Sequence, residues 1–132
     1  MLSKAGFASF VLIRDMDRAI KFYTKTLGGK LQMHAEGEMK DAWASIKIGK
    51  EEFWLVNPPG RRKKPDLAFN TFIVKNIKAY VTGFRKKGVK FEPAEKSDAT
   101  TRVDGPIAYD PFGASAFFRD SEGNLLMLWQ GT

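Results

Sequence analysis

The clearest pattern of apolar and polar positions lies near the C-terminus, at Phe117–Gln130, where two apolar runs flank a polar turn. An aromatic run leads into a turn at Asp120–Asn124, whose residue types favour a tight reversal, and the apolar segment Leu125–Gln130 follows. Both faces of this last segment are apolar, which indicates a strand covered on both sides. We therefore predict a β-hairpin. Ala44–Asn57 repeats the order of strand, polar turn and apolar strand, so the chain contains two copies of one unit.

The first copy begins with a buried strand and an amphipathic helix. Met16, Ala19, Ile20, Tyr23 and Leu27 recur at helical spacing and form one apolar stripe. In full, we expect a strand at Gly6–Ile13, a helix from an N-cap at Asp15 to a stop at Gly28–Gly29, and strands at Lys30–Ala35, Asp41–Ile48 and Glu52–Asn57. The order is β-α-β-β-β.

The second copy follows a linker at residues 58–66, which contains prolines, a glycine and the basic run Arg61–Lys64. The predicted elements are a strand at Leu67–Val74, a helix capped by Asn76 and ended by Gly88, a strand at Val89–Glu92, a long irregular loop at Pro93–Phe112, and the hairpin described above.

The two copies align with a constant offset. Asp15 corresponds to Asn76, 61 positions later, and both suit a helix N-cap. The same offset pairs Ile13 with Val74 and Ile20 with Val81, and both pairs agree in residue type. Carried to the first strands, it pairs Ala8 with Phe69.

Composition narrows the class of protein. The 132 residues suit one domain, residues 1–132, and an apolar content of 43% is sufficient for a packed core. The chain has no cysteine, hence no disulfide or thiolate metal site, and no secretory signal or membrane-length apolar run. We expect a soluble, cytoplasmic protein. A net charge of +7 favours anionic over cationic partners, although lysines scattered over a soluble surface are the preferred explanation of it.

Two segments carry a family resemblance: Asp15–Gly28 (DMDRAIKFYTKTLG) and Phe118–Leu126 (FRDSEGNLL). With the paired units, they resemble the vicinal oxygen chelate superfamily, which includes glyoxalase I, the bleomycin resistance proteins and the extradiol dioxygenases. The resemblance covers nearly the whole chain. It implies an α+β fold of two tandem βαβββ modules, residues 1–57 and 67–132, whose curled mixed sheets enclose a cleft, and it implies a homodimer.

The resemblance also implies where a divalent metal would bind. The superfamily's His and Glu ligands come from the first and last strands of each module, which here correspond to Ala8, Trp54, Phe69 and Met127. None of these side chains offers a carboxylate oxygen or an imidazole nitrogen, and the chain has one histidine, His34. We therefore expect no metal and no cofactor.

Strand alternation assigns the residues that would line the cleft. This mostly aromatic lining suits a flat, apolar or aromatic ligand, but it is equally compatible with a filled cleft or a dimer interface. In the strand at Lys30–Ala35, Leu31, Met33 and Ala35 should share one face and Gln32 and His34 the other. The predicted lining residues are Ala8, Phe10, Trp54, Phe69, Thr71, Phe117, Met127 and Trp129, with His34 and Trp43 at the rim.

Each of three polar features in the sequence has two possible interpretations. His34 suits a general base or a ligand contact, but an exposed position beside a loop is the preferred interpretation. Arg102, in the predicted loop before the last hairpin, is the candidate anchor for an anionic group, or a surface arginine. Arg61–Lys64 suits phosphate contacts, but no nucleic-acid motif accompanies it, and a solvated linker is the preferred interpretation.

The sequence thus favours a metal-free binding protein that holds an apolar or aromatic, neutral or anionic small molecule, without nucleic-acid or membrane partners. One alternative is an enzyme, either a metal-dependent lyase, isomerase or dioxygenase with unrecognised ligands, or a metal-independent catalyst that uses His34, Glu52 or Arg102. Another alternative is an interaction module with a filled cleft. We expect no catalytic residues.

Overall fold

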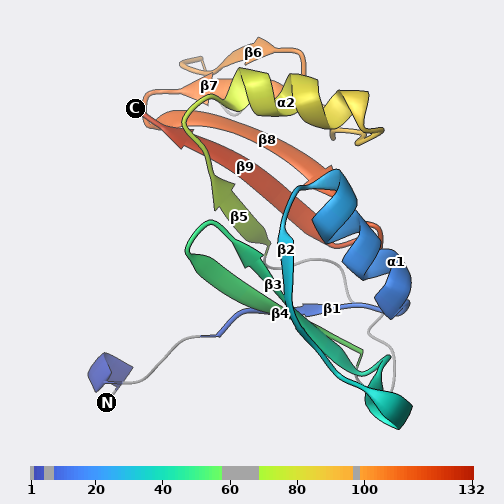
Figure 1. The fold of residues 1–132 in the computed structure, drawn as a ribbon. Coiled ribbons are helices and arrows are strands. Elements are labelled where there is room, and N and C mark those ends of the chain that lie inside the picture. The colour runs from blue at the N-terminus through green and yellow to red at the C-terminus, as the bar shows by residue number, and fades with distance from the viewer. Residues whose placement is uncertain (1, 5–7, 58–68, 97–98) are drawn as a thin grey trace. The chain divides into compact units, whose positions relative to one another are not determined.

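The computed structural model describes residues 2–4, 8–57, 69–96 and 99–132, and the chain divides into two compact units, residues 1–63 and 64–132 (Figure 1). The predicted linker, residues 58–66, lies entirely outside the described residues, and Arg61–Lys64 lies within it. That the two units form one domain stays a prediction. Within the described parts of the chain, no helix is both long and apolar enough to span a bilayer.

Unit 1 contains a four-stranded mixed sheet with one helical segment. A short helix, η1 (Leu2–Lys4), comes first. The elements that follow are β1 (Phe10–Leu12), α1 (Met16–Lys21), η2 (Phe22–Thr26), β2 (Lys30–His34), η3 (Gly37–Met39), β3 (Trp43–Ile48) and β4 (Glu51–Val56). The strand order is β1-β4-β3-β2, in which β1 runs parallel to β4 and the other neighbours are antiparallel. The predicted β-α-β-β-β order of the first copy is confirmed.

The helical segment of unit 1 starts and stops where the sequence predicts. The Arg18 amide donates to Asp15 Oδ1 at 3.1 Å, so Asp15 is the N-cap. Its second half, η2, is a turn of π-helix, which the apolar spacing did not reveal. Gly28 ends the segment at a φ of 85°, a value that favours glycine.

The core of unit 1 lies between this helical segment and one face of the sheet. The Tyr23 and Phe53 rings meet edge to face with centroids 5.1 Å apart, which identifies the covered face as the one that carries Phe53. Because side chains alternate along a strand, Leu55 on β4 lies on the same face as Phe53, and so do their partners on β3, Ala44 and Ile46. The buried set on the helix and this face comprises Val11, Ile13, Met16, Ala19, Tyr23, Ala44, Ile46 and Leu55.

Unit 2 contains a five-stranded mixed sheet covered by one helix. Its elements are β5 (Asn70–Ile73), α2 (Ile77–Lys86), β6 (Arg102–Asp104), β7 (Ile107–Asp110), β8 (Gly113–Arg119) and β9 (Leu125–Gly131). The order is β5-β9-β8-β7-β6, with β5 parallel to β9, and α2 packs across β8 and β9 (Figure 1). Asn76 caps α2 by accepting from the Ala79 amide at 3.1 Å. The buried set comprises Ile77, Val81, Ala114, Ala116, Phe118, Leu126 and Leu128.

Two predictions for unit 2 are wrong. The predicted irregular loop at Pro93–Phe112 contains the hairpin β6–β7, whose turn includes Gly105 at a φ of 59°. The predicted strand at Val89–Glu92 is reduced to a single bridge between Phe91 and Phe118. The reason is that β7 pairs with β8 over Gly113–Ser115, which leaves only the far end of β8 for Phe91.

The internal repeat is confirmed in the first strand, the helix and the last hairpin of each unit, whereas the described part of unit 2 has one strand more than that of unit 1. Phe10 pairs with Trp54 in unit 1, and Thr71 pairs with Met127 in unit 2, so the positions aligned by sequence occupy equivalent places. The two N-caps, Asp15 and Asn76, are equivalent too. The α+β class with two tandem sheet modules is therefore confirmed.

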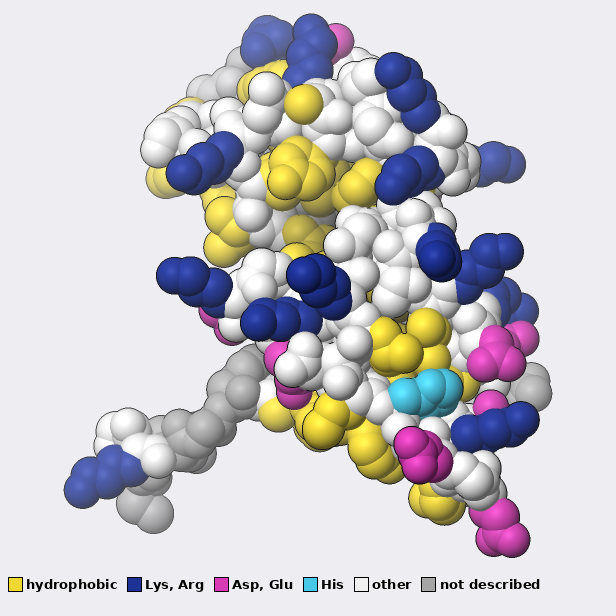
Figure 2. All heavy atoms as spheres, in the orientation of Figure 1, with side chains coloured by type: hydrophobic (Ala, Val, Ile, Leu, Met, Phe, Trp, Pro, Cys, Tyr) yellow, Lys and Arg dark blue, Asp and Glu magenta, His cyan; other side chains and the backbone are white. Residues whose placement is uncertain are grey.

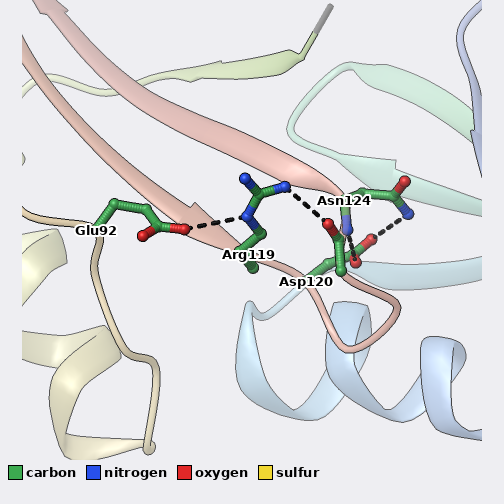
Figure 3. Close-up of polar contacts among 5 residues, drawn as sticks. Glu92, Arg119, Asp120 and Asn124 are labelled. Atoms are coloured by element: carbon green, nitrogen blue, oxygen red, sulfur yellow. Dashed lines mark hydrogen bonds and ion pairs between the residues drawn. The ribbon is translucent and has the colours of Figure 1, made fainter. Parts of the chain in front are cut away.

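The hairpin turn between β8 and β9 is held by one buried carboxylate (Figure 3). Asp120 Oδ1 accepts from the Glu122 and Asn124 amides, each at 2.8 Å, and Oδ2 accepts from Asn124 Nδ2 at 2.9 Å. Arg119 donates to the Gly123 carbonyl and to Glu92, both at 3.0 Å. The turn thus fixes the register of β9 against β8.

We expect Asp120→Ala to lower the free energy of unfolding by about 2–3 kcal/mol, because hydrogen bonds to a buried carboxylate are lost together. Urea denaturation followed by circular dichroism measures this change. Asp41→Ala, which removes an exposed carboxylate, is the matched control and should stay within about 0.5 kcal/mol of the parent. Equal effects of the two substitutions would contradict the role given to Asp120.

Candidate functional site

Each sheet has one face under its helix and one face that its own helix does not cover, here called the open face. Directly paired residues project to the same face, so register defines the open face of unit 1. One row across that face joins Phe10, Trp54, Ser45 and Met33 on four successive strands. The row beside it joins Leu12, Val56 and Trp43.

The open face of unit 1 is built from large apolar side chains that remain accessible. Phe10 is 59% exposed and Met33 is 47% exposed, although both belong to strands. The Trp43 and Trp54 rings lie against each other, with centroids 5.4 Å apart and planes tilted by 58°. A soluble domain rarely leaves contiguous apolar surface of this kind without a ligand or partner.

Ser45 is the polar exception in the middle of this row. It is fully buried, and its hydroxyl has no hydrogen-bond partner among the residues that the structure describes. The sequence analysis did not select this residue as a site candidate. Alternation did place it on the same face as Trp43, but an unpaired hydroxyl becomes visible only when the surrounding side chains are in place.

The open face of unit 2 is equally apolar. Its central row is Thr71, Met127 and Phe117, and Phe69 meets Phe117 edge to face with centroids 5.2 Å apart. The next row joins Ile73, Trp129, Ser115, Ala108 and Val103, of which Ile73 is 81% exposed.

Trp129 lies over a glycine at the start of β8. A Cβ added to Gly113 would approach the Trp129 ring to 2.9 Å and would collide with the Gln130 carbonyl. The missing side chain therefore lets the indole approach the backbone of β8 closely.

His34 and Arg102 lie apart from these rows. A bulge in β2 places Leu31 opposite Ile46 but Met33 opposite Ser45, so the predicted sharing of one face by Leu31 and Met33 is wrong. His34 pairs with Ala44 on the helix-covered side, and its Nε2 lies 2.7 Å from the Lys40 carbonyl.

Arg102 belongs to β6 rather than to a loop. Its guanidinium carbon lies 4.2 Å from the centre of the Tyr109 ring, with which it pairs across the hairpin. Tyr109 pairs in turn with Ala114, and Ala114 with Gln130, whose side chain accepts from the Ile77 amide of α2. Arg102 is therefore on the helix-covered side of its sheet.

The positions that correspond to the superfamily's metal ligands do not form a metal site. Trp54 and Met127 are half-buried, and Ala8 and Phe69 are exposed; none carries an oxygen or nitrogen that a divalent ion prefers. Across residues 2–4, 8–57, 69–96 and 99–132, no three His, Asp or Glu side chains gather closely enough to hold a metal ion. The residues present thus do not fit the metal that the fold family implies.

On the side drawn in Figure 2, the Lys and Arg side chains are spread over the surface rather than gathered in a single patch. Lys78 pairs with Asp104 at 3.7 Å, and Lys47 stands opposite Glu52 in the sheet. Such spacing produces a general positive potential rather than a defined polyanion site.

Comparison with known families agrees with the fold. Residues 7–128 match the model of the Glyoxalase/Bleomycin resistance protein/Dioxygenase superfamily. The chain therefore belongs to this superfamily, and the resemblance noted in the sequence is confirmed. A search of curated protein sequences finds no match.

Solved structures with the same fold share little sequence with this chain. TnmS3, an antibiotic binding protein from Streptomyces sp. CB03234, has a TM-score of 0.67 and 17% identity, with 98% of each chain covered. A glyoxylase/bleomycin resistance protein/dioxygenase domain from Frankia sp. EAN1pec has a TM-score of 0.69 and 23% identity, covering 98% of this chain and 94% of its own. The fosfomycin resistance protein FosX from Listeria monocytogenes, complexed with Mn(II) and sulfate, has a TM-score of 0.70 and 15% identity, covering 97% and 91%.

We expect Gly113→Ala to destabilise the protein by about 1–3 kcal/mol, because the new methyl group overpacks the strand beneath Trp129. Thermal or urea denaturation measures the cost, and a shift in tryptophan emission reports the displaced indole. Gly83→Ala in α2 is the control: its added Cβ meets no described atom within 4 Å, so it should stabilise by about 1 kcal/mol. A Gly113→Ala protein as stable as the parent would contradict the observed packing.

Proposed function

We propose that the protein is a metal-independent small-molecule binding protein of the glyoxalase/bleomycin-resistance type. Its ligand is a flat, apolar or aromatic molecule, neutral or anionic, that lies against the aromatic open face of unit 1. The single observation that carries this proposal is the row of Phe10, Trp54 and Met33, which presents carbon at the surface of unit 1 where a monomeric domain usually presents polar groups.

The physical basis is the chemistry of these side chains. Aromatic faces and a thioether stabilise a flat ring by dispersion and by removing its apolar surface from water. Binding proteins use few polar groups for orientation, and the open faces have few. The net charge of +7 opposes a cationic ligand such as bleomycin and favours a neutral or anionic one.

A metal-dependent enzyme is the second candidate. The structure of a fosfomycin resistance protein with the same fold contains Mn(II), and this observation supports the candidate. Against it stands the absence of any His, Asp or Glu among the four positions that correspond to the superfamily's ligands. A stoichiometric bound metal would favour it.

A metal-independent catalyst has less support. His34 lies on the helix-covered side of its sheet, whereas Glu52 pairs with Lys47 on the same side as Trp54. Arg102 belongs to unit 2 and stacks on Tyr109. General acid–base catalysis requires such groups within hydrogen-bond reach of one reacting atom, and in unit 1 the sheet separates His34 from Glu52.

The same proposal includes a homodimer and a cytoplasmic location, both expected from the sequence. Light scattering on the purified protein tests the first, and fractionation of cells that produce the tagged protein tests the second. An interaction module, in which the apolar faces serve only as contact surface, is the remaining alternative. It predicts no small-molecule binding.

We expect purified protein to contain far less than one transition-metal ion per chain by mass spectrometry. Because the superfamily's ligand positions lack metal-binding atoms, neither EDTA nor added Mn²⁺ should move the thermal midpoint. A stoichiometric metal, or a midpoint that EDTA lowers and Mn²⁺ restores, would support the enzyme instead.

We expect saturable binding of 8-anilinonaphthalene-1-sulfonate, an anionic aromatic dye, followed by its fluorescence. Phe10→Ala should weaken this binding about tenfold, because one exposed aromatic contact of roughly 1.4 kcal/mol is lost. Tyr80→Ala is the matched control, since Tyr80 is also an exposed aromatic residue but lies on α2. Equal weakening by both substitutions, or no saturable binding, would count against the proposed surface.

A further inference from the structure

The strongest unexplained feature of the described structure is the Ser45 hydroxyl. It is fully buried, it has no hydrogen-bond partner among the described residues, and its paired neighbours across the sheet are Trp54 and Met33. We infer that Ser45 is the hydrogen-bonding anchor of the ligand site, and that the ligand class is an aromatic molecule carrying a hydroxyl or carbonyl oxygen. This inference rests on the proposed function.

An unpaired buried hydroxyl is unfavourable for the free protein. Folding removes it from water and supplies no replacement partner, so alanine at this position would serve the apo fold as well or better. A bound molecule that brings an oxygen to Ser45 would recover the lost hydrogen bond. The gain on binding then exceeds that of the same contact made by a solvated group.

The repeat shows that Ser45 occupies a position where the other unit has a ring. Ser45 pairs with Trp54, and Phe117 pairs with Met127, the residue equivalent to Trp54. In unit 2 the Phe117 ring fills this position and contacts Phe69. In unit 1 the side chain is smaller by a phenyl ring and polar. The open face of unit 1 therefore carries a hydroxyl at this position, where unit 2 carries a ring, and neighbouring side chains cover it.

Access to Ser45 requires one neighbouring side chain to move. Met33, its partner on β2, is 47% exposed and belongs to an edge strand with a bulge next to it. Methionine is unbranched and adapts to different shapes at low cost. A ring that enters beside Trp54 can displace the Met33 thioether and place its oxygen substituent on Ser45.

The hydroxyl sets the chemical preference. Serine both donates and accepts, so it can accept from a phenol or donate to an aryl ketone or phenolate. A plain hydrocarbon of the same shape would gain the same apolar contacts but would leave the hydroxyl unpaired. The site should therefore discriminate between aromatic molecules by one oxygen atom.

The test compares naphthalene with 2-naphthol on the wild-type protein, Ser45→Ala and Ser121→Ala, using ligand-observed NMR for affinity and thermal unfolding for stability. Ser121 is the matched control because its hydroxyl is also buried and unpaired within the described structure, but it lies in the turn between β8 and β9. We expect wild-type protein to bind 2-naphthol about tenfold more tightly than naphthalene. Ser45→Ala should abolish that preference without lowering the thermal midpoint, and Ser121→Ala should keep the preference.

The outcomes separate this inference from the proposed function. If wild-type protein binds both probes equally, or if Ser45→Ala keeps the preference, Ser45 is not the anchor, while aromatic binding stands. If wild-type protein binds neither probe, the proposed function fails and the inference fails with it. The wild-type comparison needs no substitution, so equal binding of the two probes overturns the inference even if Ser45→Ala does not fold. In that case Ser45→Thr, which keeps the hydroxyl, and Ser45→Gly, which removes it, replace Ser45→Ala, and the preference should persist in the first and disappear in the second.

Discussion

The structure depends on sheets that are apolar on both faces. Side chains alternate along a strand, so a sheet with one helix has one face to bury and one to expose. Here β4 gives Leu55 to the helix side and Trp54 to the open side, and β9 does the same with Leu128 and Met127. The first set stabilises each unit. The residues on the open side are not required for packing the helix on the sheet. Their apolar character is explained if the open side binds a ligand or a partner.

The equivalent register of the two units also bears on whether the protein uses a metal ion. Because Trp54 and Met127 occupy equivalent places, both units carry a carbon side chain at the position that corresponds to a metal ligand of the superfamily. This agreement between the two units supports the proposed metal-independent function. On that proposal, a surface of rings with one buried hydroxyl, Ser45, recognises flat molecules by shape and by one hydrogen bond.

Much of this arrangement could be predicted from the sequence. Local sequence patterns identify the two N-caps, the offset between the copies and the equivalence of Trp54 and Met127. The folded structure keeps these features because the local preferences agree with the overall fold. Arg102 is predicted to lie in a loop because Gly105 and Pro106 are typical loop residues. In the structure these two residues form the turn of the β6–β7 hairpin, and Arg102 lies on β6. The bulge in β2 interrupts alternation, so the strand's face assignment was wrong. Ser45 was missed because an unpaired hydroxyl depends on neighbours that are distant in sequence.

The most direct measurement is an NMR titration of the three tryptophan indole N–H signals with 2-naphthol. Trp43, Trp54 and Trp129 all lie on open faces, so each indole reports on the surface in question. The account predicts that the Trp43 and Trp54 signals shift in a saturable manner, while backbone amides on the outer side of α2 do not. Unchanged indole signals, or shifts confined to α2, would contradict it.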